Sequence, residues 1–285
     1  MNETFTIIDG RGVLSTERRL PQPVEAVWRV LTETESLDEW FPAHVEAEPA
    51  VDGAITFVFP GEEGPPLTGR VTAYEQPHRF AYTWGDDHLE WTAEPDGGGT
   101  RLTLKHTFDD IAGAASFAAG WETCLDAAAQ VLDGVGVVVD AGASAAAHER
   151  FVELFGLDEG TIERDGEQWR VRFERQLRAG LEELWEHLGG PGFADAGGEV
   201  PEGFTVAGFP PGPVSAVEAP FFLTYHWLSA DGEPAGDVRL EFAPGPGGAR
   251  LLLTHTGTGE RAEAALAAWH DRIAELGAEA AALSK

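Results

Sequence analysis

Two histidines stand at matched places in this chain, and both are candidates for chemistry. His106 ends the string LTLKH and His255 ends the string LLLTH. Because alternate residues of a strand share a face, each histidine is predicted on the apolar face of its strand, just before a closing helix. An imidazole there suits a polar anchor for a ligand or a general base. It equally suits a core histidine that is satisfied by a backbone carbonyl or a tyrosine, and both interpretations stay open.

Motifs of the common enzyme classes do not accompany these histidines. The sequence has no G-x-S-x-G elbow, H-E-x-x-H pair, P-loop or strand-associated G-x-G-x-x-G, and its nine histidines show no metal-ligand spacing. Cys124 falls on the apolar face of a predicted helix, where a thiol is a small hydrophobic group. Asp109 and Asp110 suit the start of that helix better than acid–base work. We predict no catalytic residues, no metal and no cofactor, and the sequence favours a protein that is not an enzyme.

The histidines belong to halves that repeat one another. Gly69–Trp84 (GRVTAYEQPHRFAYTW) aligns without a gap with Gly212–Trp227 (GPVSAVEAPFFLTYHW), and further matches follow in the same order. Ordered matches over so long a stretch indicate one fold used twice rather than a solenoid of short repeats. A chain of 285 residues suits two domains. We place the first, with a linker helix at its end, at 1–157 and the second, more divergent one at 158–285.

Periodicity predicts the elements that position these residues. Val13–Leu20 reads as a strand, and the apolar positions of Val24–Leu31 follow the spacing of a helix. Short runs separated by turn residues over Ala54–Thr107 indicate an antiparallel meander. Phe117–Leu132 has a broad apolar face that needs a sheet beneath it. The second half repeats this plan and closes with a helix over Glu260–Leu283.

Composition narrows the class of partner. Hydrophobic residues make up 43% of the chain, and no apolar run approaches the roughly 20 residues of a membrane span. The 49 acidic and 19 basic residues give a net charge of −30, which repels nucleic acid phosphates and anionic membranes. We expect neither as a partner. The N-terminal string has no signal-peptide pattern and the single cysteine permits no internal disulfide, so we expect a cytoplasmic protein.

Short motifs in a fixed order carry a resemblance to a known family. They are RRLPQPVEAVW from Arg18, LDEWF from Leu37, GRV from Gly69, GTRLTL from Gly99 with His106 after it, and GW from Gly120. Together they resemble the START-like (SRPBCC) superfamily and, within it, the family named for the activator of Hsp90 ATPase. The resemblance covers residues 12–133 well and 168–283 weakly. It implies an α+β fold of two tandem helix-grip domains, each a curved antiparallel sheet wrapped around a long C-terminal helix.

The cavity of such a fold is where a ligand is expected. A curved sheet around one helix leaves a gap near the helix N-terminus, mostly apolar with a few polar anchors. The predicted ligand-binding residues of the first domain are Trp40, Phe41, Phe57, Phe59, Tyr82, Trp84, Trp91, His106, Phe117 and Trp121. Trp40 and Phe41 suit a gate and a core position equally. The second domain has no such pair, so its pocket should open towards Phe193–Phe204 or be collapsed.

These observations leave three classes of function. We favour a binding protein for a small hydrophobic or aromatic ligand, held in the cavity of the first domain, with the second domain structural or regulatory. The alternative is an Hsp90-activator-like module with a protein partner. The third class is an enzyme, such as a cyclase or hydrolase, that uses the same cavity.

Overall fold

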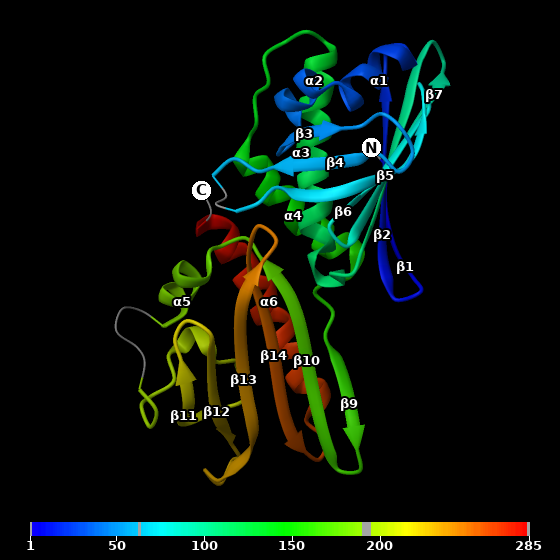
Figure 1. The fold of residues 1–285 in the computed structure, drawn as a ribbon. Coiled ribbons are helices and arrows are strands. Elements are labelled where there is room, and N and C mark those ends of the chain that lie inside the picture. Colours follow the sequence, from blue (N-terminus) through cyan, green and yellow to red (C-terminus); the bar gives the residue numbers. More distant parts are fainter. Residues whose placement is uncertain (1, 62–63, 190–194, 284–285) are drawn as a thin grey trace. The chain divides into compact units, whose positions relative to one another are not determined.

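The computed structural model describes residues 2–61, 64–189 and 195–283, and the chain divides into two compact units, Met1–Ser144 and Ala145–Lys285 (Figure 1). Each unit has an antiparallel sheet followed by one long helix, whereas the only other helices of the described chain are short or lie near the unit boundary. The predicted α+β fold with two tandem sheet-and-helix domains is confirmed.

Unit 1 holds, among its described residues, an eight-stranded sheet in the order β1-β2-β8-β7-β6-β5-β4-β3. Its strands are β1 (Asn2–Ile8), β2 (Arg11–Leu20), β3 (His44–Ala47), β4 (Ala54–Val58), β5 (Leu67–Glu75), β6 (Arg79–Trp84), β7 (Asp87–Asp96) and β8 (Gly99–Phe108). Helices α1 (Val24–Thr32) and α2 (Thr34–Trp40) come between β2 and β3, and a short turn η1 (Ile111–Gly113) leads into the long helix α3 (Ala114–Leu132). Helix α3 packs on β2, α1 and α2.

Unit 2 repeats this plan with fewer strands. Its described residues form a six-stranded sheet in the order β11-β12-β13-β14-β10-β9. The strands are β9 (Thr161–Asp165), β10 (Gln168–Leu177), β11 (Pro211–Glu218), β12 (Phe222–Leu228), β13 (Pro234–Gly245) and β14 (Gly248–Thr258). The helices are α5 (Leu181–Gly189), the short turn η2 (Glu202–Phe204) and the long α6 (Ala262–Leu283), which packs on β9 and β10.

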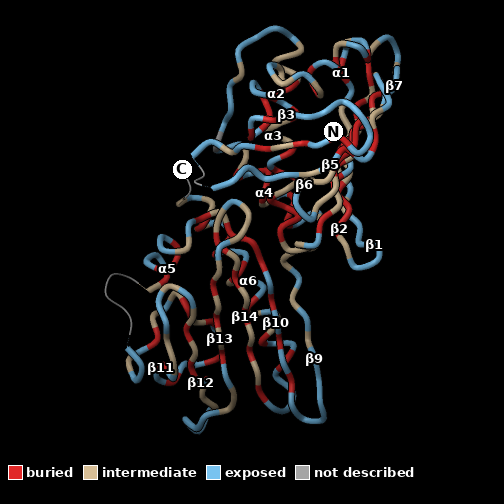
Figure 2. The backbone as a smooth tube through the Cα atoms, viewed as in Figure 1, coloured by how far each residue is buried: buried red, intermediate tan, exposed pale blue. Residues whose placement is uncertain are grey.

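The apolar pattern explains why these segments take these forms. In α1 the buried positions include Val24, Val27, Trp28 and Leu31, which is the spacing of one helix face. Along β8 every second residue is buried, so Leu102, Leu104 and His106 share the inner face of the sheet as predicted. Figure 2 shows this alternation of buried and exposed positions along the strands of both sheets.

The two compact units meet between Ser144 and Ala145, inside helix α4 (Ala141–Phe155), and the domain boundary at 157/158 stays a prediction. The carboxylate of Glu149 on α4 forms an ion pair with Arg175 of β10, a side chain that is only 3% exposed. A second nitrogen of Arg175 donates to the carbonyl of Ile273 on α6 at 2.8 Å. The C-terminal part of the predicted linker helix therefore packs as a component of unit 2.

Candidate functional site

Every residue predicted to bind a ligand lies in one aromatic cluster in unit 1. Phe41 contacts the rings of Phe57, Trp84 and Trp121, with centroids 5.8–6.2 Å apart. The remaining members join through further ring contacts: Trp40 with Trp91, Phe57 with Tyr82, Phe59 with Trp84, Trp91 with Trp121, and His106 with Trp84 and Phe117. The cluster fills the space between the inner face of the sheet, α2 and the first turns of α3.

Burial separates the interior of this cluster from its edge. The buried members are Trp40, Phe41, Phe57, Tyr82, Trp91, His106 and Trp121, whereas Phe59, Trp84 and Phe117 are partly exposed. Trp40 Nε1 donates to the carbonyl oxygen of Val30 at 2.9 Å, and Trp91 Nε1 lies 3.3 Å from Tyr82 Oη. These bonds favour core roles for Trp40 and Trp91. Phe59, Trp84 and Phe117 are the members of the cluster that reach the surface.

The imidazole of His106 is held on both sides. Trp121 Nε1 donates to His106 Nδ1 at 3.1 Å, and His106 Nε2 lies 3.0 Å from Oδ2 of Asp87. An indole N–H can only donate, so Nδ1 must accept, and the proton of the neutral ring is therefore on Nε2, where it faces the carboxylate. Neither ring nitrogen is left to remove a proton from a substrate. With both nitrogens bonded inside the protein and the ring buried, this geometry favours the interpretation of His106 as a satisfied core histidine over a general base or a direct ligand contact.

Asp87 is the site residue that the sequence analysis missed. It opens β7 directly opposite Trp84, so the two side chains lie on the same face of the hairpin. Its side chain is 26% exposed, and one carboxylate oxygen accepts from His106. Among the residues that the structure describes, no side chain bonds the other oxygen. A comparison of the two halves could have drawn attention to Asp87, because the matched position of unit 2, opposite Trp227, is Gly236.

Unit 2 keeps the tryptophan and histidine but has no carboxylate beside them. Trp269 Nε1 donates to His255 Nδ1 at 2.9 Å, as Trp121 does to His106. His255 is fully buried, and its Nε2 has no hydrogen-bond partner within the described chain. Burial, with a smaller contribution from the charge of Arg261, lowers the pKa of His255 to about 3. The imidazole of unit 2 is therefore neutral through most of the acidic range.

The apolar interior of unit 2 is closed where the structure describes it. Phe204 is fully buried and contacts the rings of Trp185 and Phe242, and its carbonyl accepts from Tyr225 Oη at 3.0 Å. A surface groove of about 720 Å³ lies beside Phe204, lined among others by Leu188, Glu202 and Val206, and the choice between an open and a collapsed pocket stays a prediction. The predicted opening at Phe193 lies outside the described residues.

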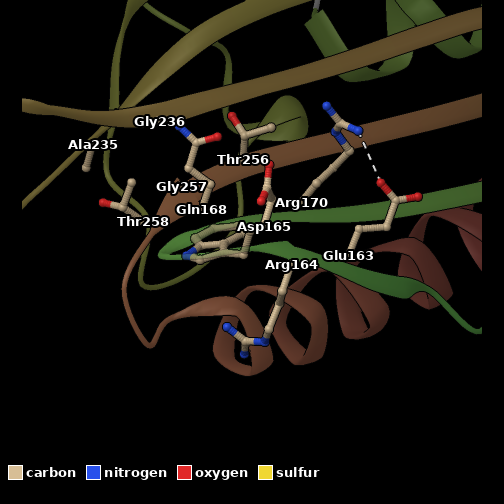
Figure 3. Close-up of a pocket in the computed structure, with 11 residues that line it drawn as sticks. Glu163, Arg164, Asp165, Gln168, Arg170, Ala235, Gly236, Thr256, Gly257 and Thr258 are labelled. Atoms are coloured by element: carbon tan, nitrogen blue, oxygen red, sulfur yellow. Dashed lines mark hydrogen bonds and ion pairs between the residues drawn. The ribbon is translucent and has the colours of Figure 1, made fainter.

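A groove of about 520 Å³ lies at the end of the unit 2 sheet (Figure 3). In Figure 3 Thr256, Gln168 and Asp165 point to one side of the strands and Arg164 points to the other. Arg170 pairs with Glu163 at 3.1 Å on the groove side. The full lining is Glu163, Arg164, Asp165, Gln168, Trp169, Arg170, Ala235, Gly236, Thr256, Gly257 and Thr258. This lining is largely polar and contains none of the predicted site residues.

The other residues considered for chemistry, Cys124 and Asp110, have structural surroundings. Burial raises the pKa of the Cys124 thiol to about 12, which supports its interpretation as a small hydrophobic group. Asp110 caps η1 by accepting from the backbone N–H of Gly113. Within the described residues, no group of three or more histidine, cysteine, aspartate or glutamate side chains could hold a metal ion. No helix in the described part of the chain is long and apolar enough to cross a membrane.

Residues 21–133 match the model of the family described as Activator of Hsp90 ATPase homolog 1-like protein. The matched stretch lies within the first unit. This match is compatible with a ligand-binding module and with an Hsp90-activator-like module, and it names no ligand. A comparison with curated proteins found no match.

Several solved structures are similar to the chain over about half of its length. A conserved protein of unknown function from Enterococcus faecalis is 23% identical, with 54% of this chain and 91% of that chain covered and a TM-score of 0.47. CalU16 from Micromonospora echinospora is 19% identical, with 54% and 96% covered and a TM-score of 0.44. A protein from Rhodobacter sphaeroides is 25% identical, with 47% and 100% covered and a TM-score of 0.40.

Proposed function

We propose that unit 1 binds a small hydrophobic or aromatic molecule at the exposed edge of its aromatic cluster. The observation that carries this proposal is the chain of hydrogen bonds Trp121–His106–Asp87, which brings a carboxylate to the rim of an otherwise apolar site. Apolar walls with a few placed polar groups are typical of small-molecule sites. Unit 2 keeps the buried part of this arrangement and lacks the carboxylate, which supports a function specific to unit 1.

The edge of the cluster supplies the contact surface for such a molecule. Trp84 is partly exposed, and its ring stacks on that of Phe59 with centroids 6.0 Å apart and planes within 10°. Phe117 approaches the same place from the first turn of α3, with its ring centroid 5.0 Å from that of His106. A planar apolar ligand could add to these rings, since aromatic pairs favour stacked and edge-on arrangements at such distances.

Exchange of Trp84 for alanine tests the site. Binding of the neutral fluorescent probe N-phenylnaphthylamine by Trp84→Ala should weaken by about 1–3 kcal/mol, because the ring that would stack on the probe is gone. Trp227→Ala is the matched control in unit 2, where the same ring is 3% exposed and donates to the carbonyl of Thr256. It should lower stability and leave probe binding in place.

Trp91→Ala separates binding from packing, because Trp91 is 2% exposed and lies inside the cluster. We expect it to lower the free energy of unfolding by about 3–5 kcal/mol, as loss of a large buried ring does. Equal losses of probe affinity and of stability at Trp84, Trp91 and Trp227 would show that all three rings are core, and the proposal would then fail. Native mass spectrometry of the purified chain provides an independent check for a co-purified small molecule.

A further inference from the structure

Besides the exchange of Asp87 for Gly236, the two units differ in the charge next to the strand tryptophan, Trp84 in unit 1 and Trp227 in unit 2. In unit 2 the guanidinium carbon of Arg261 lies 4.4 Å from the ring centroid of Phe209 and 5.4 Å from that of Trp227. Arg261 is thereby held on the face of the tryptophan that matches Trp84 of unit 1, and its Nη2 donates to the carbonyl of Gly208 at 2.8 Å. A cation over an aromatic face is attracted by the ring quadrupole. Unit 2 therefore supplies its own cation to this ring.

By sequence spacing, unit 1 has no arginine at the position of Arg261. Trp121 of α3 and Trp269 of α6 are matched by sequence and by their bonds to the two histidines. Counting back equally from these tryptophans places Gly113 at the position of Arg261. Gly113 belongs to η1, and its backbone N–H is bonded to Asp110. Among the residues that the structure describes, no guanidinium lies over the ring of Trp84 as that of Arg261 lies over Trp227.

Unit 1 has a carboxylate at this place instead. Asp87 stands opposite Trp84 on the strand register, where unit 2 has Gly236 opposite Trp227. The nearby cation Arg11 is held elsewhere, since its Nε pairs with Asp109 at 2.6 Å and its Nη2 donates to the carbonyl of Asp86 at 2.7 Å. Among the described residues, Trp227 of unit 2 therefore has a cation over its ring and glycine opposite it on the neighbouring strand, whereas Trp84 of unit 1 has a carboxylate opposite it and no cation over its ring.

We infer that the ligand of unit 1 carries a positively charged group, an amine or guanidine on an apolar or aromatic body, which lies between the carboxylate of Asp87 and the ring of Trp84. This inference rests on the proposed function and gives its ligand a chemical class. The charge of the ligand would occupy the place that the guanidinium of Arg261 takes in unit 2. The chain has a net charge of −30, which would attract such a cation to the protein surface and repel an anion.

A matched set of small probes tests this inference on the full chain. Phenethylamine, phenethyl alcohol and phenylacetate share a body and differ in charge. Titration of the isotope-labelled protein, followed by the indole N–H resonance of Trp84 identified with Trp84→Phe, should show the amine binding at least about tenfold more tightly than the alcohol, with phenylacetate weakest. Equal affinity for amine and alcohol would overturn the inference and leave apolar binding in place. No response of the Trp84 resonance to either probe would overturn the proposed function as well.

Asp87→Asn provides the decisive variant. The amide oxygen of asparagine can still accept from His106, so the substitution removes the charge with little change in shape. The amine should lose its advantage of about tenfold while the alcohol binds as before. Asp237→Asn is the matched control, because Asp237 is an exposed carboxylate of unit 2 that pairs with His226 and its loss changes the net charge equally. If Asp87→Asn keeps the preference for the amine, the inference is wrong. Should this variant fail to fold, the comparison of amine and alcohol on the unaltered chain still decides.

Discussion

At the scale of single residues, the pair of a helix tryptophan and a strand histidine is common to both units. Trp121 with His106 and Trp269 with His255 have the same donor and the same acceptor. The pair is present both with and without the carboxylate. Its common role is therefore to give a buried indole N–H an acceptor, since an unbonded buried donor costs free energy of folding. The units differ at the residue opposite the strand tryptophan, which is Asp87 in one unit and Gly236 in the other, and the proposed function rests on this difference.

His255 should make the stability of the chain depend on pH. Its pKa is lowered to about 3 in the folded state, while the unfolded chain has the ordinary value of 6.5. Below pH 6.5 the unfolded state therefore binds a proton that the folded state does not bind. The free energy of unfolding falls as the pH falls towards 3, by at most about 1.4 kcal/mol per pH unit. Denaturant titrations at about pH 7 and about pH 5.5 should show this loss in the native chain.

His255→Gln removes this proton and keeps an acceptor for Trp269, so part of the pH dependence should vanish in the variant. His270→Gln is its control, because His270 is an exposed histidine on α6, the helix that carries Trp269. An unchanged slope in His255→Gln would mean that the imidazole of unit 2 takes up its proton as readily when folded as when unfolded.

At the scale of elements, the interior helices and strands follow from the sequence because their apolar periods are strong. The edge strands β1 and β9 and the short β3 were not predicted, since their alternation is weak and their residues are mostly exposed. The cluster members on strands, such as Tyr82, Trp91 and His106, could be predicted from strand parity, and Trp121 from the apolar face of its helix. Asp87 and Arg261 were not predicted, because the pairing of each with a ring on another element shows in the structure and leaves no motif in the sequence.

Gly277 on α6 gives a test of how tightly that helix lies on its sheet. A Cβ at this position would come within 2.2 Å of Nη2 of Arg175, a buried side chain held by Glu149 and Ile273. Glycine to alanine in a helix interior normally stabilises by about 0.5–1 kcal/mol. Here we expect Gly277→Ala to destabilise by about 1–3 kcal/mol instead, because the packing is too close for another carbon.

Gly120→Ala is the matched control on α3, since a Cβ there meets nothing within 4 Å. It should show the ordinary small stabilisation in thermal or denaturant unfolding. If Gly277→Ala stabilises the chain as Gly120→Ala does, the guanidinium of Arg175 moves aside freely and is not a fixed support of α6.

At the scale of the whole molecule, the two units are expected to fold independently, since each has its own sheet and long helix. A fragment of residues 1–157 should unfold in one cooperative transition. For unit 2 the choice of boundary matters, because the ion pair between Glu149 and Arg175 joins α4 to β10. A fragment of residues 158–285 should be less stable than one of 141–285 by about 3–5 kcal/mol, the cost of leaving a buried charge unpaired.

Circular dichroism and denaturant unfolding of these fragments check both expectations. A molten or insoluble 1–157 fragment, beside a stable full chain, would mean that the units depend on one another. Equal stability of the two unit 2 fragments would show that Arg175 finds compensation without α4, and the boundary could then be drawn after the helix.

The hydrogen bond from an indole N–H to an imidazole nitrogen also gives each unit a built-in spectroscopic label. Of nine tryptophans, Trp121 and Trp269 alone, among the described residues, donate to a ring nitrogen. Such donors should stand apart in a heteronuclear spectrum of the indole region, at positions sensitive to the state of the imidazole they touch. One signal would then report on the ligand site of unit 1 and the other on the fold of unit 2, so events in the two halves could be followed separately in one intact, unmodified chain.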